Sequence, residues 1–138
     1  MKLPVTISIR SRAGKVREPL SINVPGSIEH FENGYYLNFP ITDTEEPSTF
    51  ITVCGDTVSL RHNGFEAAEF LLQKGKRYGG MYDSNFCTSY INVSTRSVQN
   101  TVKGMRGTLA FAFSIDAGGK KIDDFDMTCV ISPAVMPS

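Results

Sequence analysis

The stretch "GTLAFAFSI", residues 107–115, decides the fold class of this chain. Four large apolar side chains alternate along it with smaller ones, and this period of two is typical of a strand with one buried face. The apolar set is Leu109, Phe111, Phe113 and Ile115. The stretch therefore predicts a β-strand that contributes its apolar face to a core.

The same alternation recurs on both sides of this strand. It is found in residues 3–10, 20–24, 35–41 and 58–62, and the last strand carries the inward set Phe125, Met127 and Cys129. Eight residues between turn signals favour a strand over a short helix for residues 65–72. We expect one strand to end near Arg96 and another to follow over residues 98–103.

Turn residues separate these runs. The predicted turns are Pro25-Gly26, Asn33-Gly34, Gly55-Asp56, Asn63-Gly64, Lys74-Gly75-Lys76 and Ala117-Gly118-Gly119. Eight to ten short strands joined in this way predict an all-β protein without helix. Antiparallel neighbours favour a single up-and-down meander barrel of about eight strands, whose closure removes exposed strand edges. A two-sheet sandwich is the alternative. We expect one barrel domain over residues 1–132 and a disordered tail over 133–138.

The composition excludes several classes of protein. The 138 residues carry 14 basic and 14 acidic side chains, so the formal net charge is zero and nucleic-acid binding is not expected. No secretory signal is predicted, and no apolar run has the roughly 20 residues of a membrane helix. Three widely spaced cysteines predict free thiols that pack as small buried hydrophobes. We therefore expect a cytoplasmic protein.

Residues that could carry chemistry are few. His30 and His62 each flank a predicted turn, where a solvated surface residue is expected. Asp124 and Asp126 point away from the Phe125 side of their strand, as period-two geometry requires. The sequence therefore predicts no catalytic residue, no metal site and no cofactor.

Three segments carry a resemblance to a known family: "NGYYLNF" (33–39), "VSLRHNG" (58–64) and above all "GKRYGGMYDSNF" (75–86). The chain resembles the small cytoplasmic YwiB-like proteins of Gram-positive bacteria, a family of unknown function. The resemblance implies an eight-stranded, lipocalin-like (calycin-type) barrel and no particular activity. Family members usually have Thr, Pro and Gly where this chain has Ser84, Asn85 and Cys87, so that turn differs here.

The segment 75–86 is the candidate ligand-binding site. Gly79-Gly80 removes two side chains in mid-strand, which indicates a bulge or a close approach of backbone or ligand. Beside it, Arg77, Tyr78 and Tyr82 offer one charge and two amphipathic rings, which suit the mouth of a small-molecule pocket. A plain hairpin, with Tyr82 packed against the barrel, is the competing interpretation.

Three functions are compatible with these features. The first is a non-enzymatic binder of a small apolar or amphipathic ligand held inside the barrel. The second is a structural or protein-interaction module with a solid, packed barrel, which nine Phe and no Trp favour. The third, with the least support, is a small enzyme. A small-molecule ligand is the expected partner, membranes are not, and the chain is expected to be a monomer or a homodimer.

Overall fold

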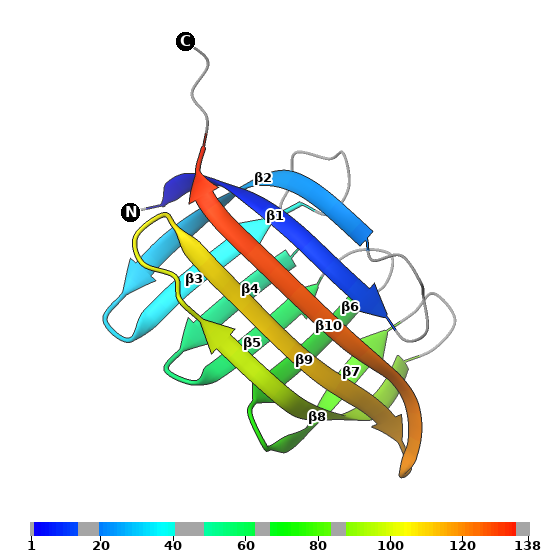
Figure 1. The fold of residues 1–138 in the computed structure, drawn as a ribbon. Coiled ribbons are helices and arrows are strands. Elements are labelled where there is room, and N and C mark those ends of the chain that lie inside the picture. Colours follow the sequence, from blue (N-terminus) through cyan, green and yellow to red (C-terminus); the bar gives the residue numbers. More distant parts are fainter. Residues whose placement is uncertain (1, 14–19, 41–48, 63–66, 84–87, 135–138) are drawn as a thin grey trace.

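The computed structural model describes residues 2–13, 20–40, 49–62, 67–83 and 88–134. Ten antiparallel strands and no helix occur within these ranges, which confirms the all-β prediction (Figure 1). The strands are β1 (Leu3–Ala13), β2 (Leu20–Phe31), β3 (Gly34–Phe39), β4 (Thr49–Cys54), β5 (Thr57–His62), β6 (Ala67–Gln73), β7 (Arg77–Asp83), β8 (Thr88–Asn100), β9 (Gly107–Ala117) and β10 (Lys120–Pro133).

The strands form a closed barrel. Each pairs with the strands before and after it in the chain, and β1 pairs with β10 to complete the ring. The long strands β1, β8, β9 and β10 cross the front of Figure 1, and the short strands β3–β7 lie behind them. Closure leaves β1 hydrogen-bonded on both sides.

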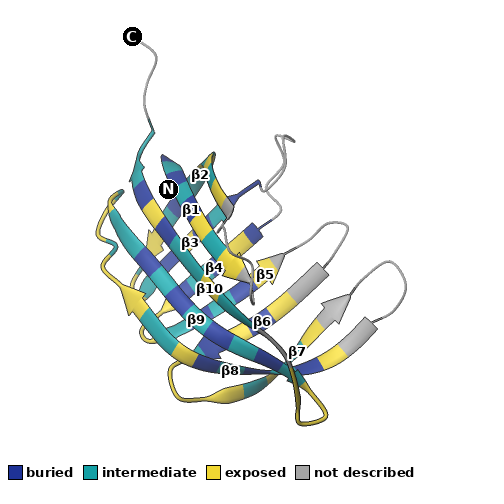
Figure 2. Ribbon diagram, turned by 45° about the vertical axis from the view of Figure 1, so that its right-hand side comes forward, coloured by how far each residue is buried: buried dark blue, intermediate teal, exposed yellow. Residues whose placement is uncertain are grey.

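Alternating side chains fill the barrel interior. On β9 the residues Leu109, Phe111, Phe113 and Ile115 are all buried, as predicted, and the residues between them are only half-buried (Figure 2). In the register, Phe113 pairs with Phe125 and Phe111 pairs with Met127, so the apolar faces of β9 and β10 coincide. Among the described side chains, every strand except β7 contributes buried apolar residues to this core.

The number of strands agrees with one of the two sequence-based predictions. Ten strands lie in the described ranges, within the eight to ten counted from the alternation but more than the eight that the resemblance implies. The strand that is hardest to read from sequence is β7, "RYGGMYD", because two adjacent glycines interrupt any apolar alternation. Lys74-Gly75 forms the predicted turn before it, and β7 then pairs with β8 along its whole length.

Two predicted chain breaks are wrong. Pro25 and Gly26 lie inside β2, opposite Thr6 and Val5 of β1, and make no turn. Gly26 instead allows a close approach, since a Cβ there would lie 2.5 Å from the carbonyl oxygen of Asn38. Likewise β8 does not end near Arg96. The strand continues to Asn100 through a β-bulge, which absorbs one extra residue without ending the pairing.

The cysteine prediction is right for Cys129 and wrong for Cys54. Both are free thiols, but Cys129 is buried in the core and Cys54 is exposed. Cys54 directly follows Val53 on β4, and a strand can turn only one of two successive side chains inward. Cys87 lies outside the described residues.

The two ends of the barrel differ in what is described. One end of the barrel, here named the turn end, is where β2, β4 and β6 finish. It carries the tight turns at Glu32-Asn33, Gly55-Asp56 and Lys74-Gly75. At the opposite end only the Gly118-Gly119 turn is described; the predicted Asn63-Gly64 turn lies outside the described residues. At the chain end, β10 runs to Pro133, and residues 135–138 are not described.

Candidate functional site

Arg77, the first predicted site residue, lies on the outer surface of the barrel. Its guanidinium donates to Asp116 Oδ1 at 2.7 Å, and the Asn92 amide donates to the same oxygen at 3.2 Å. Partial burial of Asp116 favours its protonated form, but the hydrogen bonds from Arg77 and Asn92 outweigh it and lower the pKa of this carboxyl below its usual value. These three side chains link β7, β8 and β9 across the outer face.

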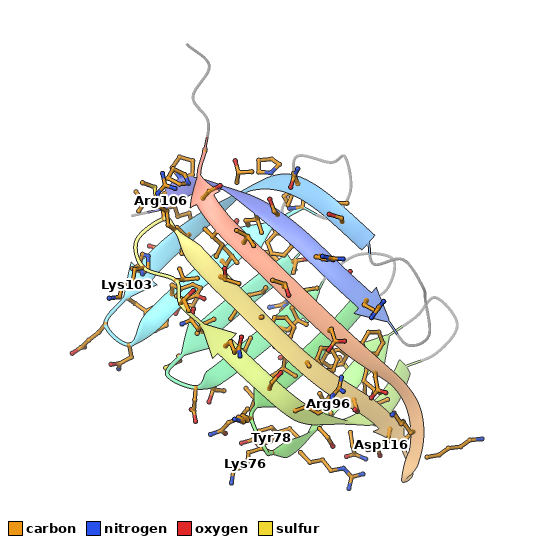
Figure 3. The ribbon with its side chains drawn as sticks, viewed as in Figure 1. Lys76, Tyr78, Arg96, Lys103, Arg106 and Asp116 are labelled. Carbon is orange, nitrogen blue, oxygen red and sulfur yellow. The ribbon has the colours of Figure 1, made fainter. Side chains whose placement is uncertain are left out.

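Tyr78, the second predicted site residue, belongs to a separate polar chain at the turn end. Its hydroxyl donates to Gln73 Oε1 at 2.7 Å, and Gln73 Nε2 donates to Asp56 Oδ2 at 3.2 Å. Figure 3 shows Tyr78 beside the turn that carries Lys76, away from Asp116. The structure therefore gives Arg77 and Tyr78 different partners and does not bring them together in one pocket.

Tyr82, the third predicted site residue, is placed by its backbone alone. It pairs with Ala68 of β6 and Ser89 of β8, and its side chain lies outside the described set. Whether Tyr82 packs against the barrel or faces a ligand therefore stays a prediction.

A cavity of about 210 Å³ lies at the opposite end, between the inner faces of β1, β5, β9 and β10. We name it the inner cavity, and it is lined by Ser11, Arg12, Leu60, Phe113, Phe125, Asp126 and Met127. Its walls are largely apolar. Phe113 stacks on Phe125 with ring centroids 5.3 Å apart, and Phe70 meets Phe113 edge-on at 5.7 Å. The sequence identified Phe113, Phe125 and Met127 as core residues but not the space beside them.

One buried polar atom lies close to this aromatic group. Thr95 is almost fully buried, and its hydroxyl has no hydrogen-bond partner. It pairs with Phe113 in the β8–β9 register. A buried hydroxyl without a partner costs about 1–3 kcal/mol and calls for an explanation. The period-two alternation of Ile91, Val93 and Thr95 places this residue on the inner face of β8.

A second concave region lies on the outside of the barrel, between β6 and β7. This groove, here named the β6–β7 groove, encloses about 640 Å³. It is lined by Ser59, Glu69, Phe70, Leu71, Gly79, Gly80, Met81, Tyr90, Ile91 and Asn92. Sequence reasoning pointed to this strand through Gly79-Gly80, but the walls come from β5, β6 and β8, whose proximity no local motif reveals.

The two glycines of the groove have different surroundings. A Cβ at Gly80 would lie 3.0 Å from a ring carbon of Phe70 and 3.2 Å from the carbonyl oxygen of Glu69. A Cβ at Gly79 would meet nothing within 4 Å. The predicted close approach of backbone therefore occurs at Gly80, whereas Gly79 keeps the groove open.

The remaining polar candidates are engaged in local contacts. His30 is exposed, and its Nε2 lies 2.7 Å from the carbonyl oxygen of Gly104, whereas the side chain of His62 is not described. Asp124 accepts from Ser114, and Asp126 is exposed as predicted and accepts from Arg96 at 3.3 Å. Within the described ranges, no group of three or more His, Cys, Asp or Glu side chains could hold a metal ion.

Comparison with known proteins identifies the family. The model of a domain of unknown function, DUF1934, matches residues 5–129. The chain belongs to the DUF1934 family. The crystal structure of the ywiB protein from Bacillus subtilis is similar to this DUF1934 chain, with a TM-score of 0.81 and 18% sequence identity. The similarity covers 97% of this chain and 94% of that one, and it confirms the predicted resemblance at the level of fold.

No curated protein matches the chain. In the described part of this DUF1934 chain there is no helix of the length and apolarity needed to cross a membrane. The family and the fold are therefore known.

Proposed function

We propose that this DUF1934 protein binds a small amphipathic molecule in the inner cavity, without chemical transformation. The observation that carries the proposal is the apolar space of about 210 Å³ beside Phe113, Phe125 and Met127. A dry apolar cavity of about 150 Å³ holds benzene in a protein core. The inner cavity has room for one aromatic ring with a small substituent, or for a short acyl chain.

The lining suggests how such a ligand would be oriented. Its apolar part would contact the stacked rings of Phe113 and Phe125, with aromatic geometry contributing beyond area burial. Its polar group would lie toward Ser11, which is half-buried at the cavity rim. The arrangement of a mostly apolar pocket with a few polar groups is the usual one for small-molecule sites.

The size of the barrel supports an interior site. Barrel diameter grows roughly linearly with strand number, and about eight strands enclose just enough room for side chains. Ten strands give a barrel about a quarter wider, so side chains fill one part of it and leave space in another. The pairing of strands in chain order also supports our assignment of a lipocalin-like, calycin-type barrel. We infer a cytoplasmic location from the sequence, in which three widely spaced cysteines predict reduced thiols.

Phenol and hexanoate are suitable probes for the inner cavity. We expect each to shift the amide NMR signals of β9 and β10 and to saturate in a titration. Met127→Trp fills the cavity and should abolish these shifts, and the matched control Val130→Trp, on the exposed face of the same strand, should keep them. Urea melts verify that both variants fold, because overpacking a core costs about 1–3 kcal/mol.

A second cavity variant keeps the test decisive if Met127→Trp does not fold. Leu60→Phe adds a ring from the facing strand β5 and should weaken phenol binding in the same way. Unchanged phenol and hexanoate shifts in a folded filling variant would refute the inner cavity as the site. The absence of any shift in the wild type would favour the alternative of a solid barrel that acts as a protein-interaction module.

Arg77, Tyr78 and Tyr82 remain proposed ligand-binding residues on the basis of the sequence, although the side chains of Arg77 and Tyr78 do not line the inner cavity. If Tyr82 contacts the ligand of this cavity, Tyr82→Ala should change phenol or hexanoate affinity and leave stability nearly unchanged. If Tyr82 is a packing residue, its removal should cost several kcal/mol, as for other buried aromatic rings. Urea melts and titrations of the same variant separate the two roles.

A further inference from the structure

The outer face of the front wall, formed by β1, β8, β9 and β10, carries more positive than negative charge (Figure 1). Each carboxylate described on this wall has a cationic partner, in the pairs Asp116–Arg77, Asp124–Lys121 and Asp126–Arg96. Arg10 and Arg12 of β1 add two further positive charges. Because the chain as a whole is neutral, this excess is a local feature of the wall.

Arg10 and Arg12 lie beside a pocket on the outer face. Residues two apart on a strand share a face, and both arginines are exposed, whereas Ile9 between β1 and the core is buried. The pocket encloses about 230 Å³, and we name it the arginine pocket. It is lined by Arg10, Ser11, Arg12, Asp126 and Thr128. In the β1–β10 register, Arg10 is opposite Thr128 and Arg12 is opposite Asp126.

The guanidinium group of Arg10 is available to a ligand. Within the described ranges, no hydrogen bond or ion pair engages it. Its neighbours in register on the two adjacent strands are Ser21 of β2 and Thr128 of β10, and each carries a hydroxyl. Guanidinium and hydroxyl groups are hydrogen-bond donors, so three strands present donors around one point on the surface.

A β-bulge brings a third arginine to this wall. The register of β8 with β9 shifts between Thr95 and Ser97, and Arg96 is the extra residue. Its guanidinium donates to Asp126 at 3.3 Å across β9, where the intervening residue in the register, Ala112, has a short side chain (Figure 3). Arg96 therefore offsets the charge of the carboxylate that lines the arginine pocket.

We propose that the arginine pocket binds a small phosphate monoester that also carries hydroxyl groups, such as a sugar phosphate. Guanidinium groups bind phosphate oxygens in a bidentate manner, through charge-assisted hydrogen bonds about twice as strong as neutral ones. The phosphoryl group has three acceptor oxygens, for Arg10, Arg12 and the Thr128 hydroxyl. Its charge of up to −2 also gains more from two nearby cations than the single charge of a carboxylate does.

Asp126 defines the rest of the ligand. An ionised carboxylate only accepts hydrogen bonds, so the ligand atom beside it is a donor such as a hydroxyl. Asp126 is diagonal to Arg10 in the register, and residues in this relation are about 7–8 Å apart. The pocket is larger than the space of about 150 Å³ that holds benzene, so a phosphoryl group and a small carbon skeleton fit together.

A nucleic acid fits this wall less well. Its affinity comes from the neutralisation of many successive phosphates. Outside the arginine pocket, the cations Arg77, Arg96 and Lys121 of the described wall are each paired with a carboxylate. The available positive charge is therefore confined to one pocket, which suits a single phosphoryl group.

NMR titrations at low ionic strength with glucose 6-phosphate, inorganic phosphate and glucose test the proposal. We expect glucose 6-phosphate to shift the amide signals of residues 10–12 and 126–128 and to saturate. Inorganic phosphate should shift the same signals with lower affinity, and glucose should leave them unchanged. Arg10→Gln should weaken glucose 6-phosphate binding by about tenfold, through loss of a hydrogen bond to a charged group. Arg61→Gln, at an exposed arginine on β5 behind the front wall, is the matched control and should bind like wild type.

Asp126→Asn tests the assignment of the hydroxyl group. Loss of the carboxylate removes its repulsion of anions and should strengthen the binding of inorganic phosphate. The preference for glucose 6-phosphate over inorganic phosphate should shrink, because the sugar hydroxyl loses its charged acceptor. These two changes distinguish a contact with Asp126 from a general effect of charge.

The proposal is wrong if sodium chloride at the same ionic strength reproduces the shifts, or if Arg10→Gln binds glucose 6-phosphate like wild type. It is also wrong if Asp126→Asn leaves the preference for glucose 6-phosphate unchanged, or if a single-stranded oligonucleotide binds these residues more tightly than glucose 6-phosphate does. Arg10 does not line the inner cavity, so Arg10→Gln should leave the binding of uncharged phenol unchanged. Failure of this proposal and failure of the proposed function can therefore be distinguished.

Discussion

The adjacent glycines of β7 allow a matched test of the packing around the groove. Neither Gly79 nor Gly80 has a positive φ, so alanine is compatible with the backbone at both positions. Replacement of Gly by Ala under these conditions stabilises a protein by about 0.4–1 kcal/mol, because the unfolded chain has fewer conformations to lose. Gly79→Ala should show this gain in full, since its Cβ would meet nothing within 4 Å.

Gly80→Ala should be destabilising. Its Cβ would lie 3.0 Å from the Phe70 ring, 3.2 Å from the Glu69 carbonyl oxygen and 3.3 Å from Cγ2 of Val93. The Phe70 ring has little freedom to retreat, because it is buried and packs edge-on against Phe113. Overpacking of this kind costs about 1–3 kcal/mol, which exceeds the entropic gain.

The difference between the two variants isolates the packing contribution. Both gain the same unfolded-state entropy, so their free energies of unfolding should differ by about 1–3 kcal/mol, with Gly79→Ala the more stable. Urea melts with a common m-value measure this difference directly. Equal stability of the two variants would refute the close approach at Gly80, and a destabilised Gly79→Ala would refute the open groove.

Three other variants or conditions test the rest of the structure. Phe111→Ala should lower the free energy of unfolding in urea melts by about 3–5 kcal/mol, because it leaves a cavity in the centre of the core. Thr108 is half-buried, and Thr108→Ala should change this free energy by no more than about 0.5 kcal/mol. Similar losses in the two variants would mean that the other face of β9 is inside. Cys54 should react with maleimide in the native protein and Cys129 should not, since burial raises the pKa of the Cys129 thiol to about 12; mass spectrometry of tryptic peptides identifies the modified residue. The lowered pKa of Asp116 contributes stability that is fully present above the ordinary pKa of 3.8 and is lost as the pH falls through the lower pKa of the folded state. The free energy of unfolding of wild type should therefore exceed that of Asp116→Asn by less below about pH 4 than at neutral pH. A difference that grows below about pH 4 would contradict this.

Local alternation was sufficient to predict most of the fold. The alternation over residues 109–115 fits a strand with one face in a core, so this strand and its inward side chains follow from the sequence alone. The Pro25-Gly26 prediction failed because the pair is also compatible with a strand in which another backbone comes close. The approach of Asn38 from β3 and of Ile7 from β1, both distant in the chain, explains the glycine.

The candidate site depends even more on contacts that no local pattern contains. The sequence marks Gly79-Gly80 as unusual, but the two glycines are indistinguishable until Phe70, Glu69 and Val93 are placed around one of them. Gly80 is then explained by packing, whereas Gly79 has no such explanation and costs stability, since glycine loses more conformational freedom than alanine in a strand. Gly79 therefore has no explanation in packing, and its open space belongs to the β6–β7 groove.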